Sequence, residues 1–258
     1  GAPYTRVGAV SYTPDLWLQL RTPELRVELE AAYVMGSREG ACAGALPDAN
    51  GVPESALMVE GAASGETCDA QRLGAALESE YRLFDQQLGI HLNAGFASGD
   101  SDSYGLAASN ATDLQRVDGE GESPDSTLHT FEFHPDYRVD LLLWRTLMGR
   151  VAGAYYINPA INYDFIRNPY GSLLGGRLDV IYSRAAVENQ SWGRDANLGV
   201  ELDVSLYYRS EDGPDPEDGF HVMAQWGVLF PLDGLREFGA SENPDNAMIL
   251  RAVAGVSY

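Results

Sequence analysis

Lysine is absent from this sequence, and basic residues of any kind are few. All 17 basic residues are arginine, against 38 aspartate and glutamate residues, and the formal net charge of the 258 residues is −21. Such a chain would be repelled by a phosphate backbone, which excludes nucleic acid as a partner. Hydrophobic residues make up 45% and charged residues 21% of the chain. This balance predicts an ordered chain, which we interpret as a single domain over residues 1–258.

Long apolar runs are also missing. A membrane-spanning helix needs about 18 or more consecutive apolar residues, and no stretch of the sequence provides them. The apolar run nearest to a helical pattern is short, Leu141-Leu142-Leu143-Trp144. The first residues, Gly1-Ala2-Pro3, do not begin a signal peptide. We therefore expect a mature chain or a fragment of a longer one.

Cysteine occurs only at Cys42 and Cys68. Both fall in the polar segment 37–71, which is rich in glycine, alanine, proline and glutamate. Two cysteines in one polar loop suggest a single disulfide and an oxidising compartment, with two free thiols as the alternative. Closing a loop of this size would stabilise the fold by about 3 kcal/mol in the chain-entropy model.

Signals for catalysis and for metal binding are scarce. None of the histidines, His91, His129, His134 and His221, has a second histidine or cysteine at metal-ligand spacing. A Gly-x-Ser-x-Gly motif and a glycine-rich phosphate loop are both absent, so we predict no enzyme and no cofactor. The oxygen-rich segments 98–103 and 212–218 could attract Ca²⁺. Solvated acidic loops are the favoured interpretation of these two segments.

What the sequence has in abundance is a hydrophobic period of two. Apolar and polar residues alternate over 25–35, 73–83, 88–96, 157–165, 174–182, 198–208, 222–230 and 248–258. A further short apolar pattern covers 16–20. Because successive side chains of a strand point to opposite faces, these runs predict antiparallel strands with one apolar and one polar face.

The alternation alone does not say which face is inside, because a soluble barrel turns its apolar face inward and a membrane barrel turns it outward. Three features favour the membrane barrel. The strands reach about ten residues, enough to cross a bilayer when tilted. Short connections at 21–24, 85–87, 167–171 and 211–219 alternate with long ones at 37–71, 98–127, 185–197 and 233–246. Aromatic residues gather at both strand ends, Phe84, Tyr163, Phe165, Tyr170, Tyr208 and Tyr258 near the short turns and Tyr33, Phe96, Tyr182 and Trp226 near the long loops.

Three stretches carry a resemblance to bacterial outer-membrane proteins. The run 248–258, which alternates and closes on Tyr258, resembles the C-terminal strand of an outer-membrane β-barrel. The stretches 133–145, Phe-His-Pro-Asp-Tyr-Arg-Val-Asp-Leu-Leu-Leu-Trp-Arg, and 225–232, Gln-Trp-Gly-Val-Leu-Phe-Pro-Leu, resemble a poorly characterised family of delta-proteobacterial outer-membrane barrels. That family is distantly similar to porins and alginate-export barrels. The resemblance covers about residues 73–258 and implies an all-β, up-and-down transmembrane barrel in the bacterial outer membrane.

The number of predicted strands indicates whether the sequence could form a whole barrel. The runs above make nine strands, whereas single-chain bacterial barrels have an even number. Either residues 4–12 form a tenth strand, or further N-terminal strands exist and this chain is the C-terminal part of a larger barrel. We expect 10–12 strands in the sequence.

The predicted inner face carries acidic residues and arginines on neighbouring strands. They are Arg26, Glu28, Glu30, Glu78, Glu80, Arg82, Arg177, Asp179, Glu201, Asp203 and Arg209. These residues either line a pore that selects solutes by charge or form a neutralised polar interior that holds the barrel shut.

Segment 129–149 breaks the alternation inside the long outer loop 98–150. Pro135 stops a strand, and Asp136 could cap a short helix with Val139, Leu142, Leu143 and Leu147 on one face. We expect the segment to fold into the lumen and to constrict it through Asp136, Arg138, Asp140, Trp144 and Arg145. An ordinary strand is the alternative.

The sequence therefore predicts an outer-membrane channel, porin-like, for hydrophilic solutes or polymers, with the lipid bilayer as its surroundings. The alternative from another class is a non-conducting scaffold barrel that anchors an envelope protein. A soluble ligand-binding barrel remains only if the apolar faces turn inward.

Overall fold

The computed structural model describes residues 8–39, 67–101, 127–168, 171–210, 219–237 and 239–257. It is an all-β protein built on one up-and-down, mainly antiparallel sheet. Among the described residues, no helix is long and apolar enough to cross a membrane. The strands are β1 (Ala9–Tyr12), β2 (Asp15–Arg21), β3 (Leu25–Glu39), β4 (Thr67–Leu83), β5 (Leu88–Ala97), β6 (Thr127–Leu128), β7 (Ala154–Arg167), β8 (Leu173–Ala185), β9 (Asn197–Arg209), β10 (Gly219–Pro231) and β11 (Ala247–Ser257).

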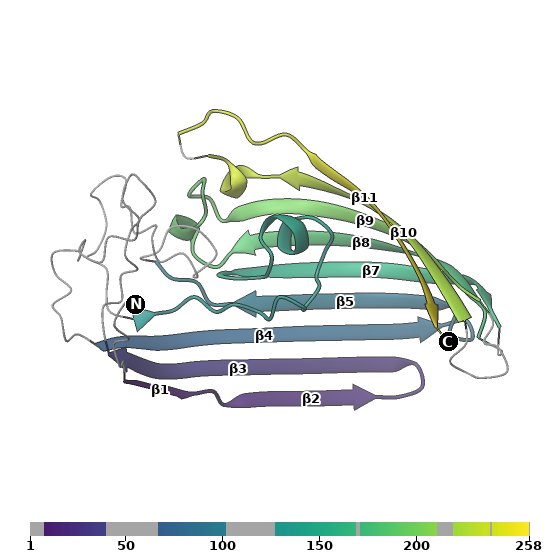
Figure 1. Ribbon diagram of the computed structural model, residues 1–258, viewed down its shortest axis with the longest axis horizontal. Helices are drawn as coiled ribbons and strands as arrows, with labels where there is room; N and C mark the ends of the chain where they lie inside the picture. Colours follow the sequence, from purple (N-terminus) through teal and green to yellow (C-terminus); the bar gives the residue numbers. More distant parts are fainter. Residues whose placement is uncertain are drawn as a thin grey trace, which may run out of the picture.

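The strand order follows the sequence across the sheet. It runs β1-β3-β4-β5-β7-β8-β9-β10-β11, and β2 also pairs with β3. Because β1 and β2 pair with successive parts of β3, they form a single edge, and the sheet is nine strands wide along that order. The long strands curve so that the sheet has a concave face (Figure 1). Its two edges, β2 and β11, are not paired with each other, so the sheet is not closed.

The connections between the strands are short at one rim of the sheet and long at the other. The tight β4–β5 turn places Phe84, Asp85 and Gln86 at φ values of 52°, 51° and 71°, in the left-handed region. Arg82 donates a hydrogen bond to the carbonyl of Gln86 at 3.0 Å and holds that turn. The rim of long connections holds a 3₁₀ turn at Glu188–Gln190, where Gln190 is fully buried. The predicted strands and their up-and-down order are confirmed.

The two faces of the sheet differ in polarity. Along β7, Asn158, Asn162 and Asp164 are buried on the concave face, whereas Ile157 and Ile161 between them are 44% and 45% exposed. The same outward set is exposed on the other strands, at Met35, Leu73, Ile90, Leu92, Leu178, Val180, Val204, Leu206, Val222, Trp226, Met248 and Leu250. The apolar faces thus turn outward, opposite to the arrangement that a soluble ligand-binding barrel requires.

A small apolar core lies on the concave side, toward the rim of long connections. It joins residues of β5, β7, β8, β9 and β10 to a segment between β6 and β7. Its members are Ala97, Phe133, Leu142, Leu143, Trp144, Val151, Ala154, Tyr156, Ile181, Ala185, Leu198 and Leu229. Toward the short turns the concave face is polar instead, and Arg82, Glu80 and Arg177 there remain partly exposed.

Two sequence predictions need correction or fall outside the description. Residues 9–12 do form a strand, but it is not a separate tenth one, because it pairs with β3 and continues the edge begun by β2. Over the described ranges the sheet has 11 strand segments, within the 10–12 expected, although they occupy only the nine positions of the order given above. The disulfide prediction lies outside the described residues, since Cys42 falls in the undescribed 40–66 and the side chain of Cys68 is not described.

Candidate functional site

The polar side chains of the concave face lie in register across the sheet. Arg26 is opposite Glu80, Glu28 is opposite Glu78, and Asp179 is opposite Asp203. Because alternate residues share a face, the whole predicted lining lies on this one face: Arg26, Glu28, Glu30, Glu78, Glu80, Arg82, Arg177, Asp179, Glu201, Asp203 and Arg209.

Ion pairs connect much of this face. Arg177 holds Asp179 through both Nε and Nη2, at 2.8 and 2.7 Å. Arg82 pairs with Glu80 at 2.5 Å and lies 3.6 Å from Asp164. Arg26 pairs with Glu28 on the same strand and lies 3.8 Å from Glu78 on the next strand. Arg209, at the exposed end of the row, donates instead to the carbonyl of Gly171 at 3.1 Å.

Residues 130–152 fold back onto the concave face, and we call them the inward segment. Figure 1 shows its short helix, a π-helix at Leu143–Leu147, in front of β7 and β8. The carboxylate of Glu201 on β9 accepts the backbone N–H groups of Leu141, Leu142 and Leu143 at 3.0, 2.7 and 3.0 Å. Asp203 accepts the Leu141 N–H as well, at 3.0 Å. Glu201 is only 1% exposed, so these charge-assisted bonds fasten the inward segment to the sheet.

The side chain of Asp140, which precedes the helix in the inward segment, accepts hydrogen bonds from the first turn of the helix. Asp140 accepts the backbone N–H of Trp144 at 3.0 Å and that of Arg145 at 3.1 Å. The indole of Trp144 is 1% exposed and donates to the hydroxyl of Ser183 on β8 at 2.9 Å. The carboxylate of Asp140 therefore orders the first turn, and the indole joins that turn to the sheet.

The predicted details of this helix were partly wrong. Asp136 does not cap it, because the helix begins at Leu143 and the side chain of Asp136 is 81% exposed. Leu147 is 56% exposed and does not share the buried face of Leu142 and Leu143. The π-helical spacing causes this difference, since a wider turn displaces residues from the positions that a 3.6-residue period assigns to them. The alternative of an ordinary strand is wrong as well.

Two charged groups of the inward segment have shifted pKa values. Burial, followed by the nearby charge of Glu201, raises the pKa of Asp140 to about 8. Burial, followed by the charges of Arg251 and Arg138, lowers the pKa of Arg145. Cationic charge is thus concentrated around Arg145, while Asp140 has a reduced tendency to ionise.

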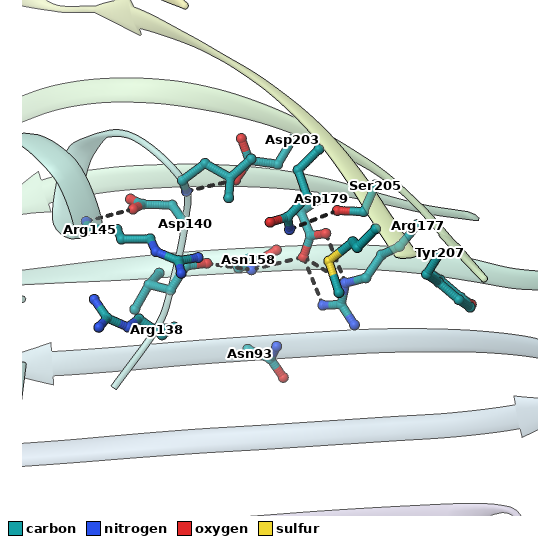
Figure 2. A pocket seen from close by; sticks show the side chains of 14 residues that line it. Asn93, Arg138, Asp140, Arg145, Asn158, Arg177, Asp179, Asp203, Ser205 and Tyr207 are labelled. Carbon is teal, nitrogen blue, oxygen red and sulfur yellow. Dashed lines mark hydrogen bonds and ion pairs between the residues drawn. The ribbon is translucent and has the colours of Figure 1, made fainter. Parts of the chain in front are cut away.

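A cavity of about 290 Å³ lies between the inward segment and strands β5 and β7–β10. Figure 2 shows Arg138 and Arg145 at one side of it and Arg177 with Tyr207 at the other. Its other polar lining residues are Asn93, Asp140, Asn158, Asp179, Asp203, Ser205 and Gln225. A second hollow of about 210 Å³, between Glu30 and Phe131, lies farther toward β3.

Of the predicted constriction residues, the structure brings Arg138, Asp140 and Arg145 to this cavity, together with Arg177, Asp179 and Asp203. Asp136 does not line it, and Trp144 lies in the apolar core. The sequence interpretation missed the cavity residues Asn93, Asn158, Ser205, Tyr207 and Gln225. Their signal was present, because each occupies the polar positions of an alternating strand.

Within the described ranges, no group of three or more histidine, cysteine or acidic residues could hold a metal ion. Of the two acidic loops considered for Ca²⁺, residues 102–103 and 212–218 lie outside the description. Asp100, in the first of these loops, is 5% exposed and accepts the backbone N–H of His129 at 3.0 Å.

A polar, charge-paired face carries a cavity with three arginines, and a fastened segment covers part of that face. Such a surface suits the binding or passage of hydrated, charged solutes. A scan against known protein families finds no match for this sequence, and no curated protein matches it.

Proposed function

We propose that this chain forms the wall of an outer-membrane β-barrel that passes hydrophilic solutes, with the inward segment narrowing its lumen. The observation that supports this most directly is the outward apolar face. Strands β8, β9 and β11 expose Leu178 at 42%, Leu206 at 55% and Leu250 at 80%. An apolar band of this breadth is unfavourable in water, at about 25 cal/mol for each Å² of exposed apolar surface, and is favourable against lipid. The polar face then lines the interior.

Aromatic side chains near the short-turn rim give further support. The rings of Tyr163 and Phe165 pack at 5.5 Å, and those of Tyr208 and Phe220 also lie 5.5 Å apart. Tyrosine and phenylalanine in such a band suit the boundary between lipid and water, where an amphipathic ring can satisfy both.

The directions of the edge strands bear on how the barrel closes. Both β2 and β11 run from the rim of long connections to the rim of short turns (Figure 1). Direct pairing of these edges would be parallel, whereas neighbouring long strands in this sheet are antiparallel. An odd number of further strands between the edges would close the barrel with antiparallel pairing throughout. We infer that such strands complete it, from a longer parent chain or from another envelope protein.

Reconstitution into planar bilayers tests this function. We expect the membrane-extracted protein to migrate differently before and after heating and to produce discrete ion conductance. Intact mass and N-terminal sequencing of the same sample identify any further strands. A protein that is monodisperse without detergent and does not insert into lipid would contradict the proposal.

A second function, a non-conducting scaffold barrel in an envelope complex, is favoured by one observation. Leu141, Leu142, Leu143 and Trp144 are at most 4% exposed, so part of the concave face is filled with packed apolar side chains. A barrel that inserts into lipid, remains electrically silent and co-purifies with a stoichiometric partner would support this function over the channel.

A further inference from the structure

Arg145 lines the cavity and carries a charged guanidinium group. Only its backbone N–H has a hydrogen bond, to Asp140, and within the described part of the chain no hydrogen bond or ion pair engages its guanidinium. Among the described residues, Arg138 has only an exposed ion pair, with Asp136 at 3.6 Å. These two arginines therefore present up to about ten N–H donors with few protein acceptors.

The carboxylates beside these arginines are already engaged by other groups. Asp140 accepts two backbone N–H groups, and Asp203 accepts that of Leu141 through Oδ2, while its buried Oδ1 has no hydrogen-bond partner among the described residues. Asp179 is held by Arg177 and also accepts from the amide of Asn158 at 3.2 Å. Within the described lining, no carboxylate therefore pairs with Arg138 or Arg145, although the formal charges of the lining balance.

We propose that the cavity between the inward segment and strands β7–β10 binds the anionic group of a solute, a carboxylate or a phosphate, through Arg145 and Arg138. Guanidinium groups match the geometry of these anions and can bind them with two parallel hydrogen bonds. The lowered pKa of Arg145 agrees with cationic crowding that an anion would relieve. The proposal rests on the function proposed above, because it names the class of solute that the lumen favours.

The test is direct binding to the whole protein in detergent, by calorimetry with inorganic phosphate and, separately, with succinate. We expect saturable binding of at least one anion, and the two titrations distinguish a phosphate site from a carboxylate site. Arg145→Gln should weaken that binding about tenfold or more, since it removes a charge-assisted, bidentate partner. Arg138→Gln should weaken it too, and its exposed position makes a folding defect a poor explanation.

Arg236→Gln is the matched control. It removes the same charge from an arginine that pairs with Asp233 at 3.0 Å outside the cavity, so binding should be unchanged. Equal affinity in wild type and both cavity variants, or no binding of either anion, would overturn the site. If the wild type still conducts ions in that case, the channel function stands and only the anion site fails. If anion binding depends on Arg145 but no conductance occurs, the site stands and the channel function fails.

Discussion

Deleting residues 135–148 should raise the single-channel conductance several-fold. These residues carry the π-helix and lie across the concave face, where Glu201 and the apolar core hold them. Without them, His134 joins Gly149, which has a positive φ and open space on the side where a Cβ atom would lie, so the junction has room. The measurement is planar-bilayer conductance at fixed salt and voltage.

The control for this deletion is removal of residues 241–245. They form an exposed part of the β10–β11 connection, outside the inward segment, and their loss should leave the conductance unchanged. Heat-modifiable migration shows whether each variant still forms its sheet. An unchanged conductance in a folded 135–148 deletion would show that the inward segment does not obstruct the pathway.

Glu201→Ala should release the inward segment without removing any of it. The substitution takes away the acceptor of the Leu142 and Leu143 N–H groups and one of the two acceptors of the Leu141 N–H, and each group left buried and unpaired costs about 1–3 kcal/mol. The segment should therefore undock, and trypsin should cleave after Arg138 and Arg145 about tenfold faster than in the wild type, or more, because an open segment is accessible to the protease. Mass spectrometry of timed digests measures the rate.

Glu80→Ala is the matched control for this release. Glu80 lies on the same polar face, opposite His91 on β5, and its ion pair is with Arg82 on its own strand, nearer the short turns than the inward segment. Cleavage at the wild-type rate is expected there. If Glu201→Ala is also cleaved at the wild-type rate, the apolar core alone holds the segment and the carboxylate has no fastening role.

The strands and their faces could be predicted from the sequence because they follow from a local rule. A period of two assigns each residue of a strand to a face, and exposed Ile161 and buried Asn162 obey it. The same rule placed Arg177, Asp179 and Asp203 on one face, and the cavity brings them together. The direction of the apolar face also followed, because strand length and the alternation of long and short connections favour a membrane barrel.

The fastening of the inward segment could not be predicted in the same way. Glu201 was placed correctly on the polar face, but its bonds to Leu141 and Leu142 join residues 60 and 59 positions apart in the sequence. No local pattern encodes such a contact. The π-helix was missed as well, because a sequence period of 3.6 assumes a regular α-helix and so put Leu147 on the buried face.

Quenching of tryptophan fluorescence by lipids with brominated acyl chains tests the central claim, that the apolar face meets lipid and the polar face does not. Trp226 lies on the apolar face at 42% exposure, and Trp17, paired in register with Glu30, lies on the polar face at 57% exposure. Each is kept as the single tryptophan, with the others replaced by phenylalanine. We predict strong quenching of Trp226 and little of Trp17, although Trp17 is the more exposed. Equal quenching of the two, or no quenching of Trp226, would contradict the claim.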